Sequence, residues 1–525
     1  MSTVSLSSPA GKWVMVSAIL ASSMGFIDGT ALNVVLPSLQ RSLGASGAQL
    51  FWILNAYLLM LASLILVGGA LGDKLGRKRV FLTGICIFML GSAACGFAPG
   101  VAWLIGFRAL QGLGGALMIP GSLSLISSSI NDNEKGKAIG TWSAVTTIVT
   151  MGGPILGGAL ADAGLWRFIF FINIPIGVAA AIVLWRKVQE SKEDGADPAI
   201  DFPGALSIAS GLALLTFGCL RIPAAGIGDG WVMASLVLGC MLLAAFVYIE
   251  RSSAHPMMPL YLFANKTFAG ANLLTFFLYA GLGGAMLFLS LDLVQAQGYS
   301  QLQSGLTFLP FTVVMILCSR MAGSLADRHG PRFFLIMGPA IAGIGLLALS
   351  LVRETRGPSA YWTTFLPGVS LFALGMSFTV APLTTAVMGA VSDQLSGVAS
   401  GVNNALTRVA NVFANALLGL LAVLLFTTSL KGRVDTLPMS AAVRQATLAQ
   451  AINLGNAKVP ATVAPGQVAL IKDAYRTAFV DVYVKIMRIA AGFAFMAALL
   501  AFLTIRNKPQ ETGFSAAKRG APLPS

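Results

Sequence analysis

The chain has 525 residues, of which 56% are hydrophobic and only 10% are charged. A soluble domain carries about 25% charged residues, so 34 basic and 20 acidic residues are too few to cover the water-facing surface of a chain of this length. The composition therefore excludes soluble, disordered and fibrous proteins and indicates many membrane-spanning helices.

A transmembrane helix needs ~20 mostly apolar residues, and this criterion predicts fourteen spans along the chain. In chain order they are 13–36, 50–70, 79–98, 102–129, 137–160, 167–186, 202–219, 231–250, 268–294, 304–325, 333–352, 362–388, 398–427 and 479–505. The first span is too long for the core of a signal peptide, so we expect it to remain in the mature protein. An even number of spans places both termini on the same side of the membrane.

The basic residues indicate which side that is, because cytoplasmic loops carry an excess of Lys and Arg. With both termini inside, the inner segments contain most of the basic residues, among them Lys74, Arg77, Lys78 and Arg79, and the short outer loops contain few. We therefore expect cytoplasmic termini. The net charge of +14 then reflects topology, and we expect no nucleic-acid partner.

The five cysteines lie within or at the ends of apolar runs, no CxxC pair occurs, and the chain has only two histidines, His255 and His329. This pattern favours small apolar packing residues over a disulfide framework or a zinc site. We therefore predict no metal site.

Two decapeptides, 69–78 (GALGDKLGRK) and 323–332 (GSLADRHGPR), share Gly, Leu, Asp and Gly at the same offsets, and each lies at the inner end of an even-numbered span. A repeat at equivalent places predicts two related halves, as in many transporters. With six spans in each half, the second copy would follow the eighth span. It follows the tenth, which indicates two additional helices between the halves.

The predicted domains follow from this repeat. They are residues 1–186 for an N-terminal six-helix half, 187–201 for a cytoplasmic linker, 202–251 for two additional helices, 252–506 for a C-terminal six-helix half and 507–525 for a cytoplasmic tail. The second half includes the outer loop 428–478, which forms either a small external cap or a mobile segment.

Four further segments carry recognisable motifs: 27–37 (IDGTALNVVLP), 105–116 (IGFRALQGLGGA), 152–158 (GGPILGG) and 166–177 (WRFIFFINIPIG). With these segments and the decapeptides, the chain resembles the fourteen-span drug:proton antiporter branch of the major facilitator superfamily over about residues 12–506. The resemblance implies an all-α fold of two six-helix halves plus two extra central helices, in the inner (plasma) membrane. It also implies a monomer that exchanges protons for a small molecule by alternating access, driven by the proton gradient without a cofactor.

A charged residue inside an apolar span costs ~2.5 kcal/mol or more, so such residues usually face a cavity and have a function. Asp28 in the first span and Arg108 in the fourth are of this kind. The resemblance implies that Asp28 carries the transported proton and that Arg108 lies beside it. Gln111 lies almost one turn further along the same helix, so we expect it to share their hydrogen bonds. The structural alternatives are a permanently paired carboxylate and an Arg108 bound to backbone carbonyls.

The first decapeptide forms a tight cytoplasmic turn. Its Asp can accept hydrogen bonds from a helix N-terminus, and its basic side chains can contact an acid or the C-terminal end of another helix. We expect these contacts to hold one transport state closed, in addition to orienting the chain. The residues are Asp73, Gly76, Arg77 and Lys78, with Asp327 and Arg328 as weaker counterparts in the second half.

The glycine-rich run of the fifth span has no chemistry of its own. Small residues let helices approach closely, and proline removes a backbone hydrogen bond and bends a helix. The resemblance identifies the run as the antiporter motif, although it can also be a simple packing run. It consists of Gly152, Gly153, Pro154, Gly157 and Gly158.

We expect a broad, apolar cavity, because aromatic and Met side chains bind large lipophilic or cationic molecules without demanding one geometry. The candidate lining residues are Phe26, Asn33, Asn55, Trp142, Phe276, Phe277, Met286, Asp292 and Arg408. Asp292, near the outer end of the ninth span, is either a second proton or cation site or, as we favour, an interfacial acid with access to water. Asp481, Lys485 and Arg488 share one helix face, where they can pair with one another.

The leading functional hypothesis is a proton-coupled exporter of many lipophilic or cationic compounds. The first alternative is the export of one endogenous lipid, antibiotic or metabolite. A membrane-embedded transferase is the alternative from a different class, but the sequence has no HExxH, GxSxG or phosphate-binding loop that would support an enzyme.

Overall fold

The computed structural model of the protein describes residues 4–191, 201–253, 256, 258–355, 357–391, 396–461 and 463–505. Over these residues all regular elements are helices, and an isolated bridge between Val4 and Ile130 is the single β-type pairing. The all-α architecture expected from the sequence is therefore confirmed. Most of the predicted linker 187–201 and the tail 507–525 lie outside the described residues.

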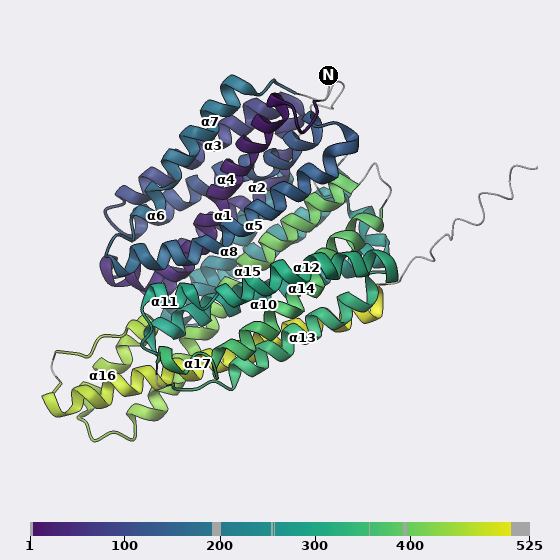
Figure 1. Ribbon diagram of the computed structural model, residues 1–525. Helices are drawn as coiled ribbons and strands as arrows, with labels where there is room; N and C mark the ends of the chain where they lie inside the picture. Colours follow the sequence, from purple (N-terminus) through teal and green to yellow (C-terminus); the bar gives the residue numbers. More distant parts are fainter. Residues whose placement is uncertain are drawn as a thin grey trace, which may run out of the picture.

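The N-terminal helices form one bundle, drawn in purple and blue in Figure 1. They are α1 (Pro9–Leu43), α2 (Gly47–Leu75), α3 (Arg77–Phe97), α4 (Val101–Ser129), α5 (Asp132–Asp162), α6 (Phe168–Phe171) and α7 (Asn173–Lys187). Two helices follow, α8 (Phe202–Ala225) and α9 (Gly230–Ser252).

The C-terminal helices form a second bundle beside the first, in green and yellow (Figure 1). They are α10 (Lys266–Gln295), α11 (Gln301–Leu306), α12 (Leu309–His329), α13 (Arg332–Ser350), α14 (Phe365–Gly389), α15 (Ser396–Val434), α16 (Ala441–Ala449) and α17 (Pro465–Thr504). Short 3₁₀ helices, η1 (Leu260–Ala264), η2 (Pro358–Ala360) and η4 (Gln450–Asn456), lie between them.

The helix ends follow local sequence signals. The Ser8 hydroxyl accepts a hydrogen bond from the Gly11 N–H (3.1 Å) and Pro9 occupies the first turn, so α1 begins there. Gly44 ends α1 with a φ of 64°, a conformation that glycine adopts without strain. Ser46 and Gln49 then form a reciprocal capping box that starts α2 after a short turn.

Each predicted span coincides with a helix or a pair of helices. Two spans are interrupted near one end, where α6 ends before α7 and α11 ends before α12. Pro175 and Pro310 lie in the first turns of α7 and α12, and proline cannot continue the hydrogen bonding of a preceding helix.

In the described part of the chain, 13 helical segments are long and apolar enough to cross a membrane. α5 is not among these 13 segments, because its apolar part, Ile148–Asp162, is shorter. The fourteenth span and the orientation of the termini therefore stay predictions.

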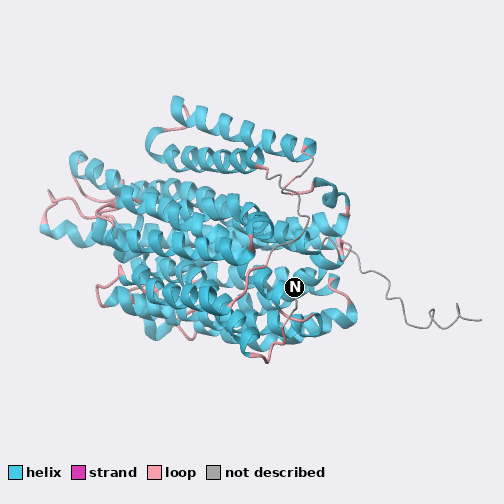
Figure 2. Cartoon of the chain, turned by 90° about the horizontal axis from the view of Figure 1, so that it is seen from above, coloured by secondary structure: helices cyan, strands magenta, loops and turns pink. Residues whose placement is uncertain are grey.

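The two additional helices stand at one edge of the bundle as a hairpin (Figure 2). α8 packs against both α2 and α15, and α9 packs against α8. α8 therefore contacts a helix from each half, which shows that the hairpin bridges the two halves at this edge.

The predicted outer loop 428–478 is shorter than the sequence indicates, because α15 continues to Val434 and α17 begins at Pro465. The segment between them contains α16 and η4, at the end of the bundle opposite to the N-terminus (Figure 1). The Gln40 Nε2 group on α1 donates to the Asn453 carbonyl (3.1 Å), and Asn456 Nδ2 donates to Gln40 Oε1 (2.7 Å). Of the two alternatives, the structure therefore supports a packed cap.

The same end of the C-terminal bundle contains a charge cluster around Asp481. Its carboxylate accepts a hydrogen bond from Arg433 (2.7 Å) and lies 3.5 Å from Arg353. The predicted pairing of Asp481 with Lys485 and Arg488 on its own helix is therefore wrong. Both of those side chains are exposed, while the Asp481 carboxylate is directed to residues from other segments.

The cap depends on a close approach between α2 and η4. A Cβ atom added at Gly47 would lie 2.8 Å from the Ile452 carbonyl oxygen, which forces a backbone shift. We expect Gly47→Ala to loosen the cap, seen as several-fold faster limited proteolysis within 435–464. Gly432→Ala is the control, because an added Cβ there meets no neighbour. Equal proteolysis of the two variants would contradict this role of Gly47.

Candidate functional site: a buried ion pair beside a central cavity

Asp28, Arg108 and Gln111 form one hydrogen-bonded network inside the N-terminal bundle. Arg108 Nη1 donates to Asp28 Oδ2 (2.6 Å) and to Gln111 Oε1 (2.7 Å), while Gln111 Nε2 donates to Asp28 Oδ1 (2.9 Å). The side chains of Asp28 and Arg108 are each only 1% exposed. Arg108 and Gln111 are three residues apart and therefore share the face of α4 that meets α1.

Helix α2 completes the environment of Arg108. Arg108 Nε donates to the Ile53 carbonyl (3.3 Å), and the guanidinium carbon lies 4.4 Å from the centroid of the Tyr57 ring. A Cβ atom added at Gly112 would collide with the Tyr57 carbonyl oxygen, so glycine permits the close packing of α4 on α2. Three helices thus converge on one guanidinium.

The structure combines the two sequence-based interpretations of Arg108, because its side chain binds both the carboxyl group of Asp28 and the backbone carbonyl of Ile53. Within the network, each oxygen of the Asp28 carboxyl group accepts one hydrogen bond. Protonation of Asp28 would remove the negative charge that balances Arg108. The network can therefore convert the gain or loss of one proton into a change in charge beside the cavity.

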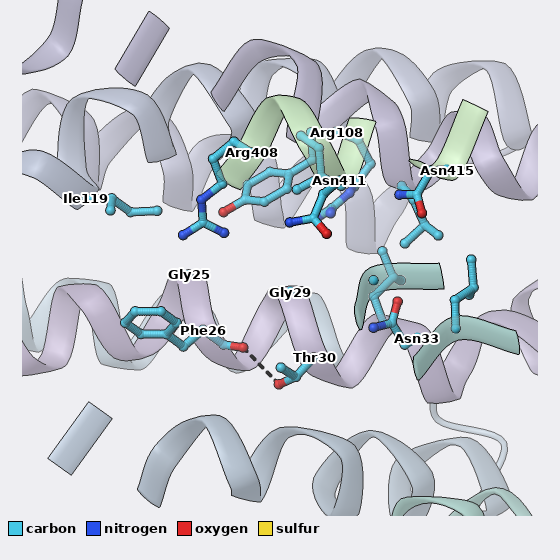
Figure 3. A pocket seen from close by; sticks show the side chains of 16 residues that line it. Gly25, Phe26, Gly29, Thr30, Asn33, Arg108, Ile119, Arg408, Asn411 and Asn415 are labelled. Atoms are coloured by element: carbon cyan, nitrogen blue, oxygen red, sulfur yellow. Dashed lines mark hydrogen bonds between the residues drawn. The ribbon is translucent and has the colours of Figure 1, made fainter. Parts of the chain in front are cut away.

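A cavity of about 180 Å³ lies between the two bundles, next to this network. Figure 3 shows Phe26, Thr30 and Asn33 on one side of it and Arg108, Arg408, Asn411 and Asn415 on the other. Its walls come from α1, α2 and α4 of the first half and from α10 and α15 of the second. The lining residues are Gly25, Phe26, Gly29, Thr30, Leu32, Asn33, Leu54, Tyr57, Leu58, Arg108, Ile119, Gly283, Leu287, Arg408, Asn411 and Asn415.

The comparisons with known proteins agree with this architecture. The family model described as Major Facilitator Superfamily matches residues 18–415. The chain belongs to this superfamily. The tetracenomycin C resistance and export protein of Streptomyces glaucescens is 29% identical over 92% of this chain and 90% of its own length. The multidrug resistance protein Stp of Mycobacterium tuberculosis is 33% identical over 76% of this chain and 74% of its own length.

A solved structure shows the same fold. The crystal structure of a bacterial homologue of the human lysosomal transporter Spinster, in an inward-facing and unoccupied conformation, matches with a TM-score of 0.64 and 20% identity. The match covers 96% of this chain and all of that one. The predicted major-facilitator-type fold is therefore confirmed.

Among the predicted cavity residues, Phe26, Asn33 and Arg408 line the cavity of this superfamily member. The others lie elsewhere in the described structure. The Trp142 indole N–H donates to the Ser22 hydroxyl (3.1 Å), and its ring stands 6.4 Å from Phe26, behind the lining. Phe276 packs on Phe413, 5.4 Å away. Asn55, Phe277, Met286 and Asp292 are also absent from the cavity walls that the structure describes.

Asp292 differs most from its prediction. Its side chain is fully buried, and Gln297 Nε2 donates to its Oδ2 atom (2.9 Å). The favoured description of Asp292 as an interfacial acid with access to water is therefore wrong. The reason is that Gln297 also donates to the Arg353 carbonyl (3.0 Å), which holds the segment after α13 over the carboxylate. A role as a second proton or cation site stays a prediction.

The predicted cytoplasmic lock is bound within the first half. Gly76 adopts a φ of 109°, and the carboxylate of Glu190 accepts hydrogen bonds from the N–H groups of Lys78 (2.9 Å) and Arg79 (3.2 Å) at the start of α3. Lys78 Nζ donates to the Trp185 carbonyl (2.9 Å) near the end of α7, where a cation is favourable. Arg328 lies exposed at the end of α12, and the side chains of Asp73 and Asp327 lie outside the described residues.

The glycine-rich run joins α5 to both halves. A Cβ atom added at Gly153 would collide with the Thr30 hydroxyl of α1, and one at Gly158 would collide with the Gln301 carbonyl of α11. Pro154 presents its carbonyl to Gly305 on the same helix, α11. Of the remaining glycines, Gly157 packs on Ala31, whereas Gly152 has open space around it. The run therefore lies at an interface between the halves, in agreement with the close approach that small residues permit.

Asp162, the last residue of α5, lies at one end of this interface between the halves. Its Oδ1 and Oδ2 atoms accept hydrogen bonds from the N–H groups of Gln301 (2.8 Å) and Leu302 (2.9 Å) at the N-terminus of α11. An acid at a helix N-terminus is stabilising because it pairs with free N–H groups and with the helix dipole. Asp162 thus holds the halves together at the end of the bundle that carries α16.

The sequence predicted that Asn411 joins Arg408 in a polar stripe facing the cavity, and Asn411 does line it. Sequence reasoning missed Tyr57 and Asn415 in the cavity, and Glu190 and Asp162 as capping acids. The polar residues of α15 share one helical face with Arg408, and this periodicity was the available signal. Neither acid has such a signal, because its partner lies far away in the sequence.

Removing one member of the buried pair leaves the other charge unpaired, which costs about 3–5 kcal/mol. We therefore expect Arg108→Gln to lower the free energy of unfolding by about 3 kcal/mol. Adding Asp28→Asn to Arg108→Gln should restore most of that loss, because no isolated charge remains. Reversible unfolding in mixed micelles measures both values. A double variant less stable than Arg108→Gln alone would contradict the pairing.

Loss of the Asp162 cap should open the end of the bundle that carries α16. With the five native cysteines replaced by serine and a single cysteine placed at Asn33, we expect Asp162→Ala to increase labelling several-fold by an impermeant thiol reagent applied from that side. Asp473→Ala is the matched control, since this exposed acid pairs only locally with Arg476 among the described residues. Unchanged labelling in Asp162→Ala would show that the cap does not hold this end closed.

Proposed function

We propose that the protein is a proton-coupled exporter of lipophilic compounds that works by alternating access. The observation that carries this proposal is the position of the Asp28–Arg108–Gln111 network, which is buried in one half and adjoins a cavity shared by both halves. The relatives named for resistance and export support the direction of transport.

The described contacts between the halves at the α16 end correspond to a closed outer side. They comprise the Asp162 cap on α11, the contact of Gln40 with Gln295 (3.4 Å) and the hydrogen bonds of Gln40 to η4. With the termini in the cytoplasm, this end faces outward. On this proposal, substrate from the cytoplasmic side enters the cavity in this state.

Coupling follows from the charge balance of the network. In the state described, the Asp28 carboxyl group accepts a hydrogen bond from Arg108. A proton that arrives from outside neutralises Asp28 and frees Arg108, which lines the cavity. Return of the halves exposes Asp28 to the cytoplasm, where the proton leaves. The proton gradient in the inner (plasma) membrane supplies the free energy without a cofactor, and one chain contains both halves, so a monomer suffices.

A dedicated exporter of one compound is the second candidate, because one relative is named for a single antibiotic and the other for multidrug resistance. The two candidates share the same coupling network. An efflux panel of unrelated compounds separates them, since a dedicated exporter moves one compound of the panel and a multidrug exporter moves many. The alternative of a membrane-embedded transferase has no support from the family or from the names of the relatives.

Proteoliposomes with an imposed pH gradient test the proposal. We expect the wild-type protein to move a lipophilic dye against its gradient and Asp28→Asn to reduce this proton-driven transport at least tenfold, because the amide cannot release a proton. Asp473→Asn, at an exposed acid, serves as the control. Full proton-driven transport by a correctly folded Asp28→Asn protein would overturn the assignment of Asp28.

A further inference from the structure

The cavity has an unusual balance of charge. Its 16 described lining residues include two arginines, Arg108 and Arg408, and no Asp or Glu. Asp28 neutralises Arg108 from behind the lining. Arg408, on α15, forms no hydrogen bond or ion pair with any residue in the described part of the chain, and its Nε atom is buried without a partner.

An unpaired guanidinium in a membrane protein is costly, and such groups usually serve a ligand. Arg408 projects into the cavity beside Phe26 and Ile119 (Figure 3). A guanidinium presents several N–H donors in a planar fork that fits a carboxylate, a sulfonate or a phenolate oxygen. An anionic oxygen therefore fits this guanidinium well.

The remaining polar groups of the cavity extend this donor surface. The side-chain amides of Asn33 and Asn415 form no hydrogen bond with other described residues. Asn415 follows Arg408 by seven residues, which places it about 10 Å further along the same face of α15. Leu54, Leu58 and Leu287 supply apolar wall between these polar groups.

We propose that this cavity binds amphipathic organic acids, with the acidic group on Arg408 and the apolar body against Phe26, Ile119 and the leucine side chains. This inference rests on the proposed function and narrows its substrate class. The sequence predicted lipophilic or cationic substrates, because aromatic residues favour cationic compounds. A cavity with an unpaired arginine and no described acid repels such compounds instead.

Three probes that share a pyrene body test this selectivity: pyrenesulfonate, pyrenemethanol and pyrenylmethyl-trimethylammonium. In proteoliposomes with a pH gradient, we expect the wild-type KM for the sulfonate to be at least tenfold lower than that for the trimethylammonium probe. Arg408→Gln should raise the KM for the sulfonate about tenfold with little change for pyrenemethanol, because one charge-assisted contact is lost. Arg408→Lys should retain part of the selectivity, since it keeps the charge without the fork.

Arg488→Gln is the matched control, because Arg488 lies exposed on α17. A lower wild-type KM for the cationic probe, or an equal rise for all three probes in Arg408→Gln, would overturn the inference. Equilibrium binding of the same probes to the purified full chain, measured as thermal stabilisation, separates this inference from the proposed function. Selective binding of the sulfonate without transport of any probe would refute proton-coupled export and leave the acid site standing, whereas equal stabilisation by all three probes would refute the acid site.

Discussion

The ion pair between Asp28 and Arg108 constrains the whole N-terminal half. Two charges that are 1% exposed and 2.6 Å apart are tolerated in an apolar bundle only as a pair, because either one alone would be unpaired in surroundings that solvate it poorly. The helices that carry them must therefore pack closely and in one register. Gly112 allows this, since any side chain there would push α4 away from α2 and draw Arg108 off the acid.

Two acids outside this pair act as helix caps. Glu190 binds the first N–H groups of α3, and Asp162 binds those of α11. A carboxylate on a helix N-terminus is a short-range contact that either forms fully or is lost. Such contacts suit a protein whose halves move, and Asp162, which joins the two halves, is the one that rocking of the halves would break.

The sequence predicted the helices and the buried pair for physical reasons that apply locally. A span must contain about 20 apolar residues, and an acid within such a run stands out. The cavity was less predictable because its lining depends on which helical faces meet after the halves pack. Tyr57 and Asn415 are ordinary residues of apolar helices until α2 and α15 come together. Asp292 was misjudged for the same reason: its place near a helix end indicates water, but Gln297 ties the distant Arg353 segment over it.

In the proposed exchange, the two arginines of the cavity link the proton site to the substrate site without a shared atom. Arg108 belongs to α4 of the first half and Arg408 to α15 of the second, so they repel each other across a cavity of low dielectric constant. Asp28 screens this repulsion from behind Arg108, and a proton on Asp28 removes the screen. An acidic substrate on Arg408 adds a screen from within the cavity. A proton on Asp28 would therefore increase the repulsion between the halves, whereas an acidic substrate on Arg408 would decrease it. These opposite effects are a physical basis for the proposed exchange.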